Sequence, residues 1–102
     1  MRQYTTPEQT DKLIELGFEK PRVAMPKFEW KDGEPQFHYT IGELIEMLPP
    51  IIDEYSSYVV SGGGTWSVHY KRIFASRYDT SSKELIDALY KMIIKLKEEG
   101  VI

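Results

Sequence analysis

The stretch LIDALYKMIIKL, residues 85–96, decides the fold. Apolar residues return in it every three or four positions, which is the spacing of one buried helical face. The apolar stripe is wide, as expected for a helix packed at the centre of a core. Ser81, followed three residues later by Glu84, predicts a capping box at the start of this helix. Gly100 is typical of a helix end, so we expect one central helix between these two signals.

The segment before this helix, residues 55–74, predicts an antiparallel hairpin. Its first arm contains Tyr58-Val59-Val60, which favours a strand, and residues 61–65 contain three consecutive glycines, which favour a turn. Apolar and polar residues alternate in the second arm, so its two faces differ. The face expected to meet the core carries Trp66, Val68 and Tyr70, and the opposite face carries Ser67, His69 and Lys71.

Two shorter helices are predicted in the first half of the chain. A capping box that begins at Thr6 precedes a helix over residues 7–16. A second capping box, which begins at Thr40, precedes a helix over residues 41–48, and Pro49 ends it.

A first hairpin is predicted between these two helices. Aromatic residues alternate with polar ones over residues 28–30 and again over residues 36–39, on either side of an Asp-Gly turn at residues 31–35. The predicted order is therefore α-ββ-α-ββ-α. We expect one small α+β domain over residues 1–102, with antiparallel hairpins packed on the C-terminal helix.

The capped segments and the second hairpin carry a family resemblance. They resemble a group of small uncharacterised proteins of gut Bacteroides-type bacteria, often carried on prophages and other mobile elements. The resemblance covers most of the chain and implies a cytoplasmic α+β domain with no assigned activity. No catalytic or binding residue is carried over from it. The segments that carry it are Thr6–Gln9, Tyr39–Leu44, Trp66–Tyr70 and Glu84–Gly100.

Composition excludes several classes of protein. The chain has 102 residues, 41% of them apolar, and a net charge of −3, which fits one globular domain. It has no cysteine, which excludes a disulfide scaffold, a thiol nucleophile and a thiolate zinc site. No apolar run is long enough to cross a bilayer, and the polar start of the chain has no signal peptide. We therefore expect a cytoplasmic protein that does not enter membranes.

The residues that most often carry catalysis form no recognisable site. The glycines at 62–64 lead into a strand rather than a helix, which favours a hairpin turn over a phosphate loop. The only histidines, His38 and His69, are expected on polar strand faces; they would approach each other only if the two hairpins shared a sheet. The paired carboxylates at 53–54 and 98–99 are interpreted as solvated charge. We expect no enzyme activity, cofactor or metal, with a small enzyme of unrecognised site as an alternative.

The charges are unevenly distributed along the chain. Residues 1–54 hold eleven acids and six bases, whereas residues 55–78 hold three bases and no acid. An acid-free interval in an acidic chain is a candidate surface for an acidic partner, either another protein or a second copy of this chain. Tyrosine and arginine are also favoured at protein interfaces. The candidate partner-binding residues are His69, Lys71, Arg72 and Arg77.

These patterns together favour a small non-enzymatic interaction protein of a mobile element or prophage, which binds a protein partner. The same basic residues and nearby tyrosines are also typical of surfaces that bind single-stranded nucleic acid. A nucleic-acid-associated accessory protein is therefore the alternative. The overall acidity of the chain makes it the less favoured of the two.

Overall fold

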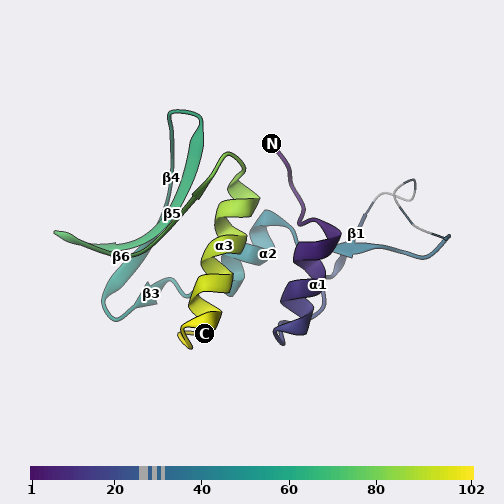
Figure 1. Ribbon diagram of the computed structural model, residues 1–102, viewed down its shortest axis with the longest axis horizontal. Coiled ribbons are helices and arrows are strands. Elements are labelled where there is room, and N and C mark those ends of the chain that lie inside the picture. The colour runs from purple at the N-terminus through teal and green to yellow at the C-terminus, as the bar shows by residue number, and fades with distance from the viewer. Residues whose placement is uncertain (26–27, 29, 31) are drawn as a thin grey trace.

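A computed structural model describes residues 1–25, 28, 30 and 32–102. Within these residues it has three helices and two antiparallel sheets, one of two strands and one of four (Figure 1). This confirms the α+β class and the packing of the C-terminal helix on a sheet. The elements in chain order are α1 (Pro7–Glu15), β1 (Val23–Ala24), β2 (Phe37–His38), α2 (Ile41–Met47), β3 (Ile51–Ile52), β4 (Tyr55–Gly62), β5 (Thr65–Arg72), β6 (Ala75–Ser82) and α3 (Leu85–Glu98).

The ends of the two short helices follow the predicted signals. Thr6 and Thr40 each accept a hydrogen bond from the backbone three residues on, and both capping boxes are complete. After α1, Gly17 adopts a φ of 97°, and the backbone N–H of Phe18 donates to the carbonyl of Leu13. A left-handed glycine that redirects the chain in this way satisfies the last carbonyls of a helix. Local chemistry therefore sets the bounds of α1 and α2.

The predicted capping box of α3 is wrong. Ser81 and Ser82 belong to β6, where they pair with Ser67 and Trp66 of β5. Because these two serines are held in β6 by sheet pairing, α3 begins only after Glu84, whose side chain makes no capping hydrogen bond. The Glu84 carboxylate instead accepts a hydrogen bond from the backbone N–H of Arg2.

The larger sheet is a meander in the order β3-β4-β5-β6. Gly63 and Gly64, with φ of 60° and 82°, make the tight turn between β4 and β5, as the glycine run predicts. The sequence analysis missed β3 and β6, so four strands rather than two separate α2 from α3. The reason is clearest for β6. Its residues are mostly polar and only Tyr78 is fully buried, so the strand lacks the apolar alternation that marks a half-buried strand.

The first hairpin is only partly as predicted. Its second arm is β2, but β2 pairs with Val23–Ala24 rather than with residues 28–30. The predicted Asp-Gly turn is present, with Asp32 and Gly33 at φ of 53° and 71°, but the strand that pairs with β2 comes earlier in the chain than residues 28–30. Phe28 is 86% exposed, and Glu29 and Lys31 of the predicted hairpin lie outside the described residues.

The core lies around α3. Figure 1 shows the four-stranded sheet on one side of α3, with α1, α2 and the small sheet on the other side. Val68 and Tyr70 point from β5 into this core, as predicted, while Trp66 is half-buried. The Tyr70 hydroxyl donates to the carbonyl of Pro49 at 2.6 Å, and burial raises the pKa of this phenol to about 12. The buried residues of α3 are Leu85, Ile86, Ala88, Leu89, Met92, Ile93 and Leu96.

A polar cluster ties the N-terminal segment to α3. The Arg2 guanidinium donates to both carboxylate oxygens of Asp87, and the Gln9 amide donates to the same group at 2.7 Å. Burial alone raises the pKa of Asp87, but the hydrogen bonds from Gln9 and Arg2 and the charge of Arg2 outweigh it. The pKa of Asp87 is therefore lowered, and its carboxylate holds the first residues of the chain on α3.

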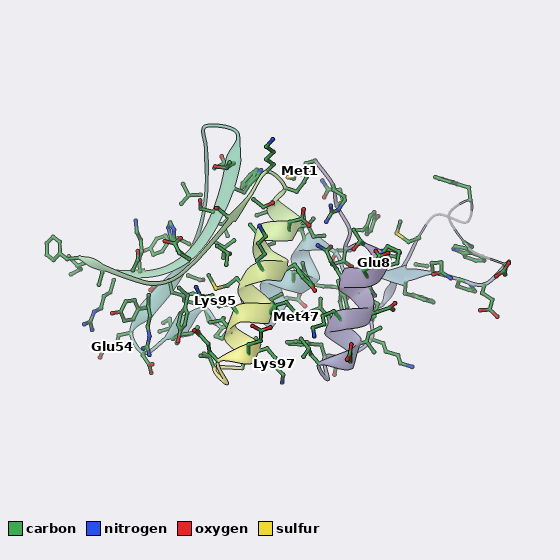
Figure 2. All side chains as sticks on the ribbon, viewed as in Figure 1. Met1, Glu8, Met47, Glu54, Lys95 and Lys97 are labelled. Atoms are coloured by element: carbon green, nitrogen blue, oxygen red, sulfur yellow. The ribbon has the colours of Figure 1, made fainter. Side chains whose placement is uncertain are left out.

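Within the described part of the chain, no helix has the length and apolar character needed to cross a membrane. Figure 2 shows side chains all around the molecule, with Glu54 at one end of the larger sheet and Glu8 on α1, beyond α3.

Candidate functional site

One face of the larger sheet has no helix packed on it among the residues that the structure describes. Figure 1 shows α3, α2 and α1 on the other side of this sheet. The strand register places Ser56, Tyr58 and Val60 of β4 beside Lys71, His69 and Ser67 of β5, respectively. Neighbours such as Val68 and Tyr70 point the opposite way, into the core. We call the surface formed by Ser56, Tyr58, Val60, Ser67, His69 and Lys71 the outer face.

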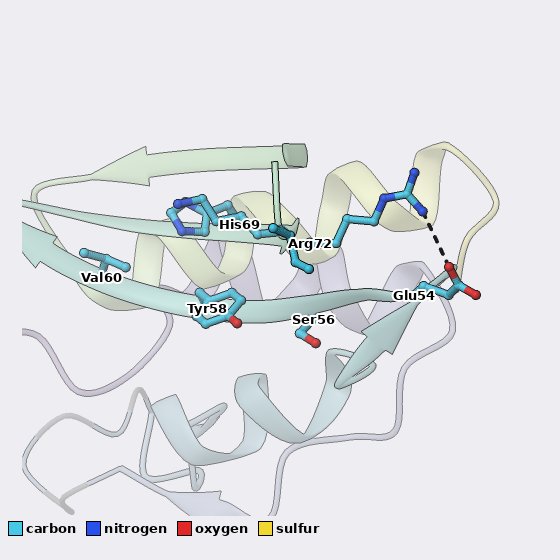
Figure 3. A pocket seen from close by; sticks show the side chains of 8 residues that line it. Glu54, Ser56, Tyr58, Val60, His69 and Arg72 are labelled. Carbon is cyan, nitrogen blue, oxygen red and sulfur yellow. Dashed lines mark hydrogen bonds and ion pairs between the residues drawn. The ribbon is translucent and has the colours of Figure 1, made fainter. Parts of the chain in front are cut away.

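The outer face contains a shallow groove of about 540 Å³. All outer-face residues except Ser67 line it, together with Glu54, Arg72 and Ile73. Figure 3 shows Glu54 and Arg72 paired at one end of the groove and Val60 at the other. Tyr58 and Val60 are 50% and 48% exposed, and they give the groove an apolar and aromatic wall. The sequence analysis treated these two residues only as strand formers. Their place on the outer face follows from their pairing with His69 and Ser67 across the hairpin, and the length of the glycine turn sets that pairing.

His69 forms the floor of the groove. Its side chain is only 13% exposed, because Tyr58 and Asp79 lie opposite it on the two flanking strands. Nδ1 lies 3.4 Å from the Asp79 carboxylate, and the imidazole and Tyr58 ring centres are 6.2 Å apart. Nε2 is covered and has no hydrogen-bond partner among the described residues. His69 therefore points outward as predicted, but it contributes shape more than accessible charge.

Arg72 and Arg77 lie in different places. Arg72 ends β5 and lines the groove, with its guanidinium 3.5 Å from Glu54 and 5.0 Å from the ring centre of Tyr55. Arg77 lies within β6, over the rings of Tyr55 and Tyr78, and does not line the groove. The register of β5 and β6 shifts at Tyr70/Lys71, which adds a residue on β6 and breaks its alternation. The structure thus brings three of the four predicted residues together and sets Arg77 apart.

The acid-free interval of the sequence is not an acid-free surface. Asp53 and Glu54 form the turn between β3 and β4 with φ of 47° and 72°. Asp53 lies 2.8 Å from Arg77, Glu54 lies 3.5 Å from Arg72, and Asp79 faces His69. The two neighbouring carboxylates are solvated as predicted, with side chains 71% and 86% exposed, and each one also pairs with an arginine. In the described part of the chain, Lys71 is the candidate residue that faces no carboxylate.

The turn between β5 and β6 carries two strongly exposed apolar residues, of which Ile73 also lines the groove. Ile73 and Phe74 form the turn between β5 and β6 and are 89% and 99% exposed. Turns usually carry glycine, asparagine, aspartate or proline, so two large apolar residues at this position are a signal that the sequence analysis overlooked. They form an exposed apolar turn at the end of the outer face.

The two histidines do not form a pair. His38 belongs to the two-stranded sheet and His69 to the four-stranded sheet, so the condition for their approach is not met. His38 is buried, not on a polar face, and its Nδ1 bonds the carbonyl of Thr5. Among the described residues, no three histidine, aspartate or glutamate side chains converge as metal ligands would.

Comparisons of this chain with family models, curated proteins and solved structures find no match. The described residues define a small α+β domain in which none of the helices covers one face of the four-stranded antiparallel sheet.

Proposed function

We propose that this protein is a small non-enzymatic interaction domain whose outer face binds a partner protein. In keeping with the sequence resemblance, the proposal places it in the cytoplasm as part of a mobile element or prophage. The observation that carries the proposal is the groove on the open face, which Tyr58, Val60 and Ile73 line with exposed side chains. A concave surface that combines exposed aromatic and aliphatic side chains with a few polar groups is typical of binding sites.

The charges of the groove favour a particular kind of partner. Glu54 already faces Arg72, so this guanidinium attracts a further anion weakly, and Asp79 lies beside His69. Lys71 is exposed and faces no carboxylate among the described residues. We therefore propose that the partner contributes apolar side chains to Tyr58 and Val60 and one carboxylate to Lys71, rather than an acidic tract. Such a complex depends on salt only modestly, because few charges pair across it.

Single-stranded nucleic acid is the second candidate. Tyr58 offers a ring for stacking, and Lys71 and Arg72 lie beside it in the groove. Glu54 and Asp79 stand along the same surface, where they would repel a phosphate backbone. The protein partner is therefore the function that the geometry supports best.

The test is selection from a displayed library of random peptides on the immobilised protein. We expect enrichment of peptides with apolar residues and a single acid. Their binding should fall at least about tenfold, about 1.4 kcal/mol, in the double variant Tyr58→Ser, Lys71→Glu. Lys20→Glu, an exposed charge change near α1, is the matched control and should bind like the wild type.

Two outcomes contradict the proposal. One is the absence of enriched peptides, and the other is equal binding by the double variant and the wild type. A fluorescence anisotropy titration with single-stranded DNA belongs to the same experiment. Steeply salt-dependent binding of the DNA that the double variant loses would favour the nucleic-acid candidate instead.

A further inference from the structure

The edge of β4 is open along most of its length. β3 pairs only with its first two residues, Tyr55 and Ser56. Every residue from Ser57 to Gly62 is exposed, and no described strand lies beyond them. An open edge presents unpaired N–H and C=O groups that another strand can pair with.

The backbone groups at this edge can be identified. The N–H of Ser57 donates to the carbonyl of Pro50 at 3.0 Å, so Ser57 directs its backbone away from β5. Backbone direction alternates along an antiparallel ladder. Val59 and Ser61 therefore direct their N–H and C=O groups to the open edge, whereas Tyr58 and Val60 bond to β5.

The β4 edge lacks the features that keep natural edges apart. Proteins protect such edges with charged side chains, proline or bulges. The strand Tyr55–Gly62 contains none of the three among its eight residues. At the other edge of the sheet, β6 carries Arg77 and Asp79 and has a register shift. The two edges thus differ, and only β4 is suited to pairing.

We infer that β4 pairs antiparallel with β4 of a second copy, about a two-fold axis at Val60. In this register Val59 lies opposite Ser61 of the second copy, and the two residues exchange N–H···O bonds on both sides of the axis. An axis at Val59 would instead need the Ser57 N–H, which Pro50 already holds. Each copy thus supplies the same two residues, Val59 and Ser61, to the new backbone hydrogen bonds, as a two-fold interface requires.

The side chains of this register are compatible with self-pairing. Val60 meets its own copy as a close non-hydrogen-bonded pair, which brings two half-exposed apolar side chains together. Tyr58 lies opposite Gly62, where an aromatic ring covers a strand glycine. No charge is present on either strand, so no like charges meet. The dimer has one continuous sheet in which the two outer faces lie side by side.

A cysteine cross-link tests this register. The chain contains no cysteine, so a single introduced thiol is unambiguous. In the variant Val60→Cys the two Cα atoms lie about 4.5 Å apart, within the range that a disulfide spans. In Tyr58→Cys the two thiols lie four positions apart along the strands, about 13 Å, and cannot join. Ser81→Cys on the exposed edge of β6 reports random collision.

In a glutathione redox buffer we expect Val60→Cys to form a covalent dimer at least about tenfold faster than either control. Equal rates in all three variants would overturn the inference. Sedimentation provides a second measurement without cysteine: the wild type should sediment as a dimer, and Ser61→Pro as a monomer. This proline removes an N–H that faces the open edge, so it leaves the pairing with β5 intact. A monomeric wild type at high micromolar concentration would also overturn it.

This inference is independent of the proposed function. Ser61 does not line the groove, so Ser61→Pro should keep the binding of the selected peptides. Loss of the dimer with retained peptide binding separates the two claims. Loss of peptide binding in Lys71→Glu with a retained dimer separates them in the opposite direction, because Lys71 lies on β5 and takes no part in the β4 register.

Discussion

Leu89 lies at the centre of the core, and its replacement by alanine tests the role of α3. The side chain is 0% exposed, and α3 has the larger sheet on one side and α2 on the other. Leu89→Ala removes three carbon atoms, which is about 2.4 kcal/mol of transfer free energy at ~0.8 kcal/mol for each carbon. Packing on both sides limits collapse around the cavity, which adds to the loss. We expect a total of about 3–4 kcal/mol, within the range measured for buried leucines.

The measurement is a denaturant titration of wild type and variant, with equal slopes to confirm that both unfold in one step. Ile94→Ala is the matched control, because it removes the same number of carbons from a half-buried position of α3. It should cost less than about 2 kcal/mol, since half of that surface already meets water. A loss below about 0.5 kcal/mol for Leu89→Ala, or equal losses in the two variants, would refute the reasoning that α3 organises the core.

Three further predictions concern charge and chain conformation. The pKa of Asp87 is lowered in the folded protein, so its carboxylate stabilises the fold at pH values above its ordinary pKa of 3.8, and this contribution is lost as the pH falls through the folded pKa. The melting temperatures of wild type and Asp87→Asn should therefore differ at pH 7 and converge near pH 2. A difference that stays constant with pH would contradict this. Gly100→Val places a β-branched residue at a φ of 74° and should cost about 1–3 kcal/mol by chemical denaturation, whereas an unchanged midpoint would argue against the left-handed helix end. The double variant Lys71→Glu, Arg72→Glu should weaken peptide binding but change stability by less than about 1 kcal/mol, because both residues are exposed, and unfolding of the variant would show that they serve the fold instead.

The bounds of α1 and α2 and the end of α3 were predictable because their determinants are local. Thr6 and Thr40 bond to residues three positions away, and Gly17 and Gly100 act on their own turns. The inward direction of Val68 and Tyr70 was predictable for the same reason, since alternation along one strand needs no knowledge of its partners.

The rest depends on pairing between strands. Ser81 and Glu84 have the spacing of a capping box, but the ladder with β5 holds Ser81 in β6. The interval without acids looked basic because Asp53 and Glu54 lie just outside it in sequence, although the β3–β4 turn returns them to Arg77 and Arg72. The groove likewise needs the register of β4 against β5, which alternation within one strand does not supply.

The central claim is that the outer face binds a partner protein. Its most direct test is a two-dimensional amide NMR titration of the protein with a peptide selected on it. The predicted result is that shifts concentrate in residues 56–60 of β4 and 67–72 of β5, while α1 and the two-stranded sheet stay unchanged. Shifts centred on α1 or on the two-stranded sheet would contradict the claim.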